Sequence, residues 1–359
     1  MKPELELQQV IVRRGGRQVL SVDQISIYNH ETLAVIGPNG SGKSTLLLAL
    51  ARLIEPDSGQ ILFRGQNIRE MQALAYRRRI ALVLQDPLLL SGSVDDNVAV
   101  GLRFRGIPPA EINKRVQYWL EKLGIAHLRK RMANSLSGGE AQRVSLARSF
   151  VLEPDILMLD EPFSALDAPT RRRLLDDIHQ LLKSTPVTSL FVTHDMNEAL
   201  LLADRVAVLL NGRMVQMGSP QQVFTTPASQ EVAAFVGVET IIPGTAQSMQ
   251  DGLVQITAGG FRLEAVGQAE PGSKVYLCLR PEDITLWTAE NVRSSSARNQ
   301  LQGRIERLLP EGPLVRVQLD CGFMLVALIT RASAEALELQ EGMRVAAGFK
   351  ASAAHMIPR

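Results

Sequence analysis

The sequence predicts an α/β domain with a helical insertion, followed by an all-β domain. The first observation is a glycine-rich motif, Gly37 to Thr45, placed between an apolar tetrad at 33–36 and an apolar helical run at 46–50. The second is the alternation of short apolar runs with helical spacings as far as about residue 235. The third is that apolar residues recur at every second position after that point, as strands require. A chain of 359 residues is long enough for two or three domains.

The composition of the chain limits the partners that we expect. Lys and Arg number 39 and Asp and Glu 37, so no overall charge attracts nucleic acid or an anionic membrane. The two cysteines, Cys278 and Cys321, are too few for a disulfide framework or a zinc site and are expected in the core, which suits a reducing cytoplasm. Without a secretory signal or an apolar run of membrane-spanning length, the protein is expected to be soluble.

The motif at the start of the first domain reads G-x-x-x-x-G-K-S and predicts a phosphate-binding loop at a strand-to-helix turn. Its glycines let backbone N–H groups point at phosphate oxygens, while Lys43 can neutralise the β- and γ-phosphates and the Ser44 hydroxyl can ligate Mg²⁺. The alternative, a glycine-rich turn that binds nothing, is disfavoured because Lys43 and Ser44 both stand in register. The residues predicted to contact the phosphates are Gly37, Pro38, Asn39, Gly40, Ser41, Gly42, Lys43, Ser44 and Thr45.

Strand patterns flank this loop on both sides. Residues 1 to about 30 alternate around the turn Arg14-Gly15-Gly16 and predict an antiparallel edge sheet, and residues 205–218 predict a hairpin that closes the domain. A buried strand at 80–84 ends at Gln85, after which helical spacings predict a helical insertion as far as about Phe150.

Three further stretches carry polar groups that a phosphate site needs. Ser137-Gly138-Gly139 opens a helix within the insertion, and bare N–H groups at a helix start attract an anion. Asp160 and Glu161 end an apolar strand, where Asp160 can hold Mg²⁺ and Glu161 can orient or deprotonate the attacking water. Adjacent carboxylates could also only begin a helix, but the phosphate loop favours the functional interpretation. His194 ends another buried strand and is predicted to contact the γ-phosphate, although a lone histidine there is often structural.

These motifs, in this order, resemble those of the ATP-binding subunit of an ABC transporter: the phosphate loop, Gln85, Leu136 to Glu140, Asp160-Glu161 and His194. The resemblance covers residues 1 to about 235 and implies a P-loop NTPase fold with a helical subdomain at about 86–150. It also implies ATP and Mg²⁺ as cofactors, Glu161 and His194 as catalytic residues, and Ser44, Gln85 and Asp160 around the metal.

The resemblance implies partners as well. Two copies would pair head to tail and bind each ATP between the phosphate loop of one copy and Ser137, Gly138, Gly139 and Glu140 of the other. Permease subunits and an extracytoplasmic solute-binding protein would complete an importer, with this chain at the cytoplasmic face of the membrane and Gln85 reporting to the permease through residues 86–92. The family usually stacks adenine on an aromatic residue where this chain has Arg14, and an arginine can also stack on a base.

The C-terminal third contains two similar blocks, at 236–290 and 294–359, joined by a polar linker at about 287–295. Gly260-Phe261-x-Leu-x-Ala265 matches Gly322-Phe323-x-Leu-x-Ala327, and Arg280 matches Lys350. The blocks predict a duplicated, OB-like β-barrel domain.

The second block begins with Ser296-Ala297-Arg298-Asn299 and ends with Phe349-Lys350-Ala351-Ser352, and a barrel would bring those ends together. Cations, hydroxyls and backbone N–H groups suit a small oxyanion. Both stretches resemble the molybdate-binding barrel repeat of molybdate and tungstate proteins, which implies Ser296, Arg298, Asn299, Lys350 and Ser352 as oxyanion ligands. A purely structural barrel with solvated charges is the alternative. The first block has Glu239-Thr240-Ile241-Ile242 at this place and is not expected to bind in the same way.

The function that these expectations favour is ATP hydrolysis that powers the import of molybdate or tungstate, with barrels that sense the cytoplasmic oxyanion. An importer ATPase for another solute, such as sulfate, a sugar or a polyamine, with structural barrels is the alternative within the same class. A soluble ATPase that acts on ribosomes or DNA is disfavoured by the single cassette, and a mere oxyanion store by the complete set of Lys43, Asp160, Glu161 and His194.

Overall fold

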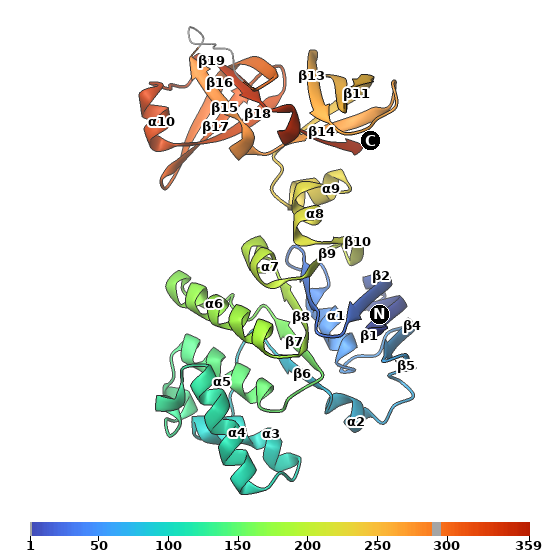
Figure 1. Ribbon diagram of the computed structural model, residues 1–359, viewed down its shortest axis with the longest axis vertical. Helices are drawn as coiled ribbons and strands as arrows, with labels where there is room; N and C mark the ends of the chain where they lie inside the picture. Colours follow the sequence, from blue (N-terminus) through green and yellow to red (C-terminus); the bar gives the residue numbers. More distant parts are fainter. Residues whose placement is uncertain (1, 289–295) are drawn as a thin grey trace. The chain divides into compact units, whose positions relative to one another are not determined.

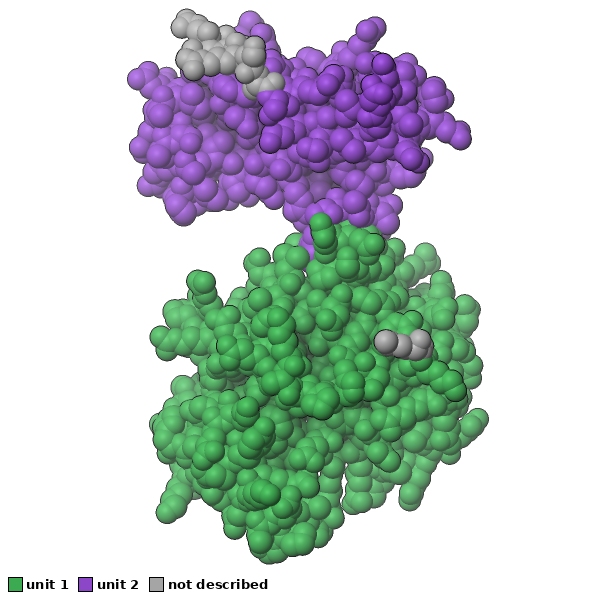
Figure 2. Space-filling model, in the orientation of Figure 1, with its two compact units in different colours: residues 1–223 green, residues 224–359 purple. Residues whose placement is uncertain are grey.

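The computed structural model describes residues 2–288 and 296–359, which form two compact units that meet in the chain at Val223 and Phe224 (Figure 2). This boundary precedes the predicted one at residue 235. Arg280 donates a hydrogen bond to the carbonyl oxygen of Phe224, and His355 Nε2 lies 3.2 Å from the carbonyl oxygen of Pro227. These bonds tie residues 224–235, which include α9 (Gln230–Phe235), to the C-terminal strands.

Unit 1 is built on a ten-stranded mixed sheet with the order β5-β4-β1-β2-β10-β9-β3-β8-β7-β6. The predicted hairpins at residues 1–30 and 205–218 are confirmed as the antiparallel pairs β1–β2 and β9–β10, whereas β9, β3, β8, β7 and β6 are mutually parallel. The strands are β1 (Pro3–Arg14), β2 (Arg17–Tyr28), β3 (Thr32–Ile36), β4 (Ser58–Phe63), β5 (Gln66–Asn67), β6 (Ile80–Val83), β7 (Ile156–Asp160), β8 (Thr188–Thr193), β9 (Arg205–Leu210) and β10 (Arg213–Gly218).

The helices of unit 1 include a group, α3, α4 and α5, which pack against one another, and α5 of this group also contacts β6 (Figure 1). They occupy the predicted helical insertion. Capping boxes at Ser93 and Ser137 start α3 and α5, and the Trp119 ring of α4 stacks on Phe150 of α5 with ring centroids 4.9 Å apart. The helices are α1 (Lys43–Leu50), α2 (Ala73–Arg77), α3 (Val94–Phe104), α4 (Pro109–Lys122), α5 (Gly138–Phe150), α6 (Ala168–Ser184), α7 (Met196–Leu202) and α8 (Pro220–Thr225).

The central strands of unit 1 are buried along their whole length. All residues of β3 and β8 are buried, as expected of parallel strands covered on both faces. Such strands end at a rigid edge, so residues that follow them are held in fixed positions. In the part of the chain that the structure describes, no helix combines the length and apolar character that crossing a membrane requires.

Unit 2 contains two five-stranded antiparallel sheets, with the orders β13-β12-β11-β14-β20 and β15-β19-β16-β17-β18. Each predicted block gives its last strand to the sheet of the other, because β15 pairs with β19 and β20 pairs with β14. The strands are β11 (Thr240–Gln250), β12 (Leu253–Ala258), β13 (Phe261–Val266), β14 (Lys274–Leu279), β15 (Thr285–Thr288), β16 (Asn299–Glu311), β17 (Leu314–Asp320), β18 (Met324–Thr330), β19 (Arg344–Phe349) and β20 (His355–Pro358); one helix, α10 (Arg331–Ala336), follows β18.

This exchange corrects two details of the sequence-based expectation. Trp287 and Thr288, placed in the linker, end β15, while residues 289–295 of that linker lie outside the described residues. Apolar side chains of both blocks also share a single core rather than two. Alternation along the chain predicts each strand but carries no information about which distant strand it pairs with. Cys278 and Cys321 are free and buried, as predicted, and burial raises the pKa of the Cys278 thiol to about 12.

Candidate functional site

The phosphate loop, Asp160-Glu161 and His194 follow three neighbouring strands of unit 1, and we call this place the nucleotide edge. Ile36 of β3 pairs with Thr193 of β8, and Val192 of β8 pairs with Asp160 of β7. Because the strands are parallel, the residues after them project at the same edge of the sheet. Motifs that lie far apart in the sequence are thereby brought together.

Lys43 is held in place within the phosphate loop. Its Nζ lies 2.9 Å from the carbonyl oxygen of Gly37, 3.1 Å from that of Pro38 and 3.4 Å from Glu161 Oε1. The ammonium group is nearly buried, with 5 % exposed. Gly37 is required because a Cβ there would lie 2.2 Å from the carbonyl oxygen of Leu209. The loop therefore curls around its own lysine, which faces the carboxylate of Glu161.

Ser44 and Asp160 form the candidate magnesium site. The Ser44 hydroxyl donates a hydrogen bond of 3.1 Å to Asp160 Oδ1. Burial, helped by the neighbouring Glu161 charge, raises the pKa of Asp160, and the Ser44 hydrogen bond acts in the opposite direction. A hydroxyl and a carboxylate are hard oxygen donors that suit Mg²⁺, which uses few protein ligands and completes its shell with water and phosphate. Within the described residues, no group of three or more His, Cys, Asp or Glu side chains is placed to hold a metal ion.

Glu161 adopts an unusual backbone conformation, with φ at +43°. A positive φ is uncommon for a residue other than glycine and indicates a conformation that its surroundings enforce. The Glu161 N–H donates to the Val192 carbonyl oxygen at 3.0 Å, and the Ser164 hydroxyl donates to the Glu161 carbonyl oxygen at 2.9 Å. The side chain then lies between Lys43 and His194, whose Nδ1 is 2.9 Å from Glu161 Oε2. Backbone and side-chain contacts together aim this carboxylate.

A buried carboxyl group supports the segment that carries His194, and the sequence analysis did not identify it. Glu198 Oε2 accepts a hydrogen bond of 2.5 Å from the hydroxyl of Thr193, which in turn accepts one of 3.0 Å from the N–H of Asp195. Burial raises the pKa of Glu198 to about 7. An acidic residue among the apolar positions of α7 was the signal that could have revealed it.

The stretch Ser137 to Glu140 starts α5, as predicted. Ser137 is the N-cap, and its N–H donates to Glu140 Oε2 at 2.7 Å, which lowers the pKa of that carboxyl. A Cβ on Gly138 would meet no atom within 4 Å, whereas one on Gly139 would lie 2.6 Å from Thr170 Cγ2. Gly138 thus faces open space and Glu140 caps its own helix. Among the described residues, no hydrogen bond or ion pair joins this stretch to the phosphate loop.

Gln85 and Arg14 lie at exposed positions. Gln85 comes just after β6, which pairs with β7, so it lies at the nucleotide edge on the side of Asp160. Arg14 ends β1 opposite Arg17, at the tip of the first hairpin. The predicted roles of both residues stay predictions.

The predicted oxyanion residues of unit 2 lie where β16 and β19 end together, and we call this place the oxyanion junction. Asn299 pairs with Phe349, so Arg298 and Lys350 occupy the next opposed positions. Ser352 lies in the 3₁₀ turn η5 (Ala351–Ala353), which packs against β13. The side chains of Ser296, Arg298, Lys350 and Ser352 are exposed.

Asn299 has a different place in the junction. It is 2 % exposed, and its amide accepts a hydrogen bond from the Glu264 N–H at 2.7 Å and donates one to the Glu264 carbonyl oxygen at 2.8 Å. The side chain therefore links β16 to β13 in the manner of a strand pair. Arg298 forms an ion pair with the carboxylate of the same Glu264, with Nε 2.5 Å from Oε2.

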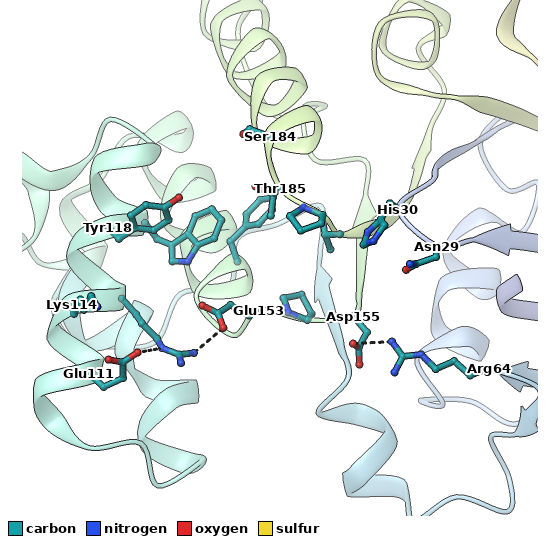
Figure 3. Close-up of a pocket in the computed structure, with 16 residues that line it drawn as sticks. Asn29, His30, Arg64, Glu111, Lys114, Tyr118, Glu153, Asp155, Ser184 and Thr185 are labelled. Atoms are coloured by element: carbon teal, nitrogen blue, oxygen red, sulfur yellow. Dashed lines mark hydrogen bonds and ion pairs between the residues drawn. The ribbon is translucent and has the colours of Figure 1, made fainter. Parts of the chain in front are cut away.

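A cavity of about 850 Å³ lies at the opposite end of the parallel strands of unit 1 (Figure 3). Figure 3 shows Glu111 and Glu153 on one wall and Arg64, bonded to Asp155, on the other. Arg115 forms ion pairs with both Glu111 and Glu153. The charges on these walls are thus balanced by their neighbours. None of the predicted site residues lines this cavity.

Comparisons with known proteins agree with the two-unit arrangement. The family model for the ABC transporter matches residues 20–164, and the model for the TOBE domain matches residues 295–356. The molybdate/tungstate import ATP-binding protein of Pyrococcus horikoshii is 42% identical over 91% of this chain and 92% of its own length. A spermidine/putrescine import ATP-binding protein of Pseudomonas aeruginosa is 34% identical over 99% of both chains.

A solved structure extends the likeness to three dimensions. The structure of cbiO1 from Clostridium perfringens, part of the ABC transporter complex cbiONQ, matches with a TM-score of 0.59 and 32% identity. The match covers 67% of this chain and 96% of that one. The chain therefore belongs to the ABC transporter family, as an ATP-binding subunit in which an ATPase domain is followed by a TOBE domain.

Proposed function

We propose that this chain hydrolyses ATP to power an importer of molybdate or tungstate and binds the same oxyanion at its oxyanion junction. The hydrolytic part rests on the contact set of the nucleotide edge, where Glu161 lies between Lys43 and His194. The cargo rests on the likeness to the Pyrococcus horikoshii protein, which extends through both units, and on Arg298 and Lys350, which flank the pair of Asn299 and Phe349.

Glu161 is the proposed general base. Its carboxylate is oriented by His194 at 2.9 Å, so it can accept the proton of a water placed against the γ-phosphate. Lys43, now 3.4 Å from Glu161, is placed to neutralise phosphate oxygens. Ser44, Asp160 and Gln85 would hold Mg²⁺, which neutralises charge on the β- and γ-phosphates when bound. Each protein group thus has one task that its contacts support.

We further propose that two copies pair head to tail around ATP. The open position of Gly138 at the start of α5 supports this, because the N–H groups there can reach a phosphate of a partner copy. The phosphate loop of the same chain makes no bond to this stretch among the described residues. Permease subunits would hold the pair at the cytoplasmic face of the membrane, and a solute-binding protein would deliver the anion from the other side.

Solute uptake by cells tests the cargo. Cells that lack this chain, complemented with the wild type or with Glu161→Gln, are assayed for uptake of labelled molybdate, tungstate, sulfate and putrescine. We expect the wild type alone to restore molybdate or tungstate uptake. Restoration of putrescine uptake instead would assign the cargo of the Pseudomonas aeruginosa relative. If cells that lack the chain take up all four solutes normally, a role in import is contradicted.

A further inference from the structure

We propose that Glu264 is an internal occupant of the oxyanion junction, a carboxylate that a bound oxyanion must displace from Arg298. The inference rests on the proposed function of Arg298 and Lys350 as oxyanion ligands. It adds a residue that comes from the opposite block of unit 2 and that sets both the affinity and the selectivity of the site.

The ion pair occupies the groups that an oxyanion needs. Arg298 Nε lies 2.5 Å from Glu264 Oε2, and Arg298 Nη2 donates to Glu264 Oε1 at 3.3 Å. Arg298 therefore contacts both carboxylate oxygens, through an ion pair with Oε2 and a hydrogen bond to Oε1. A tetrahedral oxyanion is recognised by the same fork, with two of its oxygens. An oxyanion that takes this edge of the guanidinium, formed by Nε and Nη2, must therefore displace the carboxylate.

The position of Glu264 is fixed independently of its side chain. The Asn299 amide bonds the N–H and the carbonyl oxygen of Glu264, so the strand that carries the carboxylate is anchored to β16. The Glu264 side chain is 22% exposed, whereas that of Arg298 is 59% exposed. The cation is thus the more solvent-accessible partner, and ions in solution can reach it while the pair is formed.

The corresponding position in the other half of unit 2 lacks this carboxylate. Thr240, at the place of Asn299, accepts a hydrogen bond of 3.1 Å from the N–H of Val326, which stands at the place of Glu264. The carboxylate there is Glu239, next to Thr240 in the chain, and it pairs with Arg316. Only the junction with two opposed cations, Arg298 and Lys350, receives a carboxylate from the facing strand among the described residues.

A displaced carboxylate selects for charge. Glu264 brings one negative charge to Arg298, so an incoming ion gains from the exchange only if it binds Lys350 as well or carries more charge. Doubly charged tetrahedral oxyanions satisfy both conditions, whereas nitrate and chloride bring no more charge than the carboxylate that they would replace. The junction would therefore ignore the abundant monovalent anions of a cell.

The test is calorimetric titration of the full chain, without nucleotide, with sodium molybdate. We expect Glu264→Ala to bind about 10- to 100-fold more tightly than the wild type, the range that loss of one competing charged contact implies. Glu239→Gln, which removes a carboxylate paired with arginine in the other half, is the matched control and should change the affinity less than about twofold. Chloride should compete with molybdate in Glu264→Ala more than in the wild type.

Two loss variants keep the outcomes distinct. The first, Arg298→Ala, leaves the buried Oε2 of Glu264 without its cation and can disturb folding. The second is therefore Lys350→Ala, at an exposed position where loss of the side chain leaves no buried charge. Loss of binding in Lys350→Ala with unchanged or weaker binding in Glu264→Ala would overturn the displacement and leave the oxyanion site standing. If Glu239→Gln gained as much affinity for molybdate as Glu264→Ala, the gain would be explained by the change in overall charge, and the displacement would be overturned. Absence of binding in both the wild type and Glu264→Ala would overturn the site and the displacement together.

Discussion

The nucleotide edge and the oxyanion junction both hold a carboxylate against a cation, but they build the pair differently. At the nucleotide edge, Lys43 and Glu161 follow β3 and β7, two parallel strands of one sheet separated only by β8. At the junction, Arg298 and Glu264 come from two sheets that meet because each block gives a strand to the other. The first pair is set by local motifs and the second by long-range exchange.

The contrast has a consequence for function. Glu161 is fixed by a positive φ and by backbone bonds on both sides, so its carboxylate keeps one direction. Glu264 is anchored through its backbone alone, which leaves its side chain free to give up Arg298. A catalytic base benefits from the first arrangement and an exchangeable ligand site from the second.

The largest expected effect lies at the nucleotide edge. Glu161→Gln should lower ATP turnover roughly 10²- to 10⁴-fold with ATP binding preserved, because the amide cannot accept the proton. Steady-state hydrolysis and nucleotide-binding assays measure the two quantities. Glu153→Gln is the matched control, since Glu153 also has a positive φ but precedes the amino end of β7. Near-normal turnover in Glu161→Gln would contradict the role of Glu161 as a base, and with it the functional contrast between Glu161 and the exchangeable Glu264.

The next effect concerns the anchor at the junction. Asn299→Ala should lower the stability of unit 2 by roughly 3–5 kcal/mol, because two buried backbone groups of Glu264 lose their partner. Calorimetric unfolding of the full chain measures it, with the exposed neighbour Gln300→Ala as control. A loss as small as that of Gln300→Ala would mean that the exchange of strands alone holds the two sheets together.

The third prediction concerns Glu198, the buried carboxyl that supports the segment carrying His194, and it depends on pH. The pKa of Glu198 is raised to about 7 in the folded protein, so the folded state holds this proton more tightly than the unfolded state. The protonated carboxyl contributes its full stabilisation below pH 4.5, the ordinary pKa of a glutamate. This contribution, up to about 3 kcal/mol, is lost as the pH rises through 7. Glu198→Gln stays neutral, so the difference in unfolding temperature between wild type and variant should change from pH 5 to pH 8. A constant difference would contradict a buried, titrating Glu198.

The smallest effect distinguishes two neighbouring glycines of α5. Gly139→Ala places a methyl group 2.6 Å from Thr170 Cγ2 and should cost about 1 kcal/mol of stability. Gly138→Ala meets nothing within 4 Å and should be neutral or slightly stabilising in the single chain. If Gly138 faces the nucleotide of a partner copy, the same variant should nevertheless lower hydrolysis. Normal hydrolysis in Gly138→Ala would speak against the paired arrangement.

The sequence predicted the nucleotide edge well because its information is local. The motif at Gly37 to Thr45 requires a strand before it and a helix after it, and both β3 and α1 are present. The alternation of β1 and β2 and the hairpin of β9 and β10 were likewise visible in short stretches. Parallel pairing then collects the strand ends at one edge.

Residues that depend on distant pairing escaped prediction. Glu264 has no motif, and its role is visible only once β13 lies beside Arg298. The same cause placed Trp287 in a linker, although it lies in β15 and pairs with β19 of the other block. Glu198 was missed because an acidic residue among the apolar positions of a short helix is a weak signal, and its role is visible only once Thr193 is seen to donate to it.

The most direct measurement of the central claim is calorimetric titration of the wild-type full chain with molybdate, tungstate and sulfate. The account predicts binding of molybdate or tungstate, and this binding should be lost in Lys350→Ala while ATP hydrolysis is kept. Absence of binding of any oxyanion would contradict the oxyanion junction and leave an ABC transport ATPase whose cargo must be sought among other solutes.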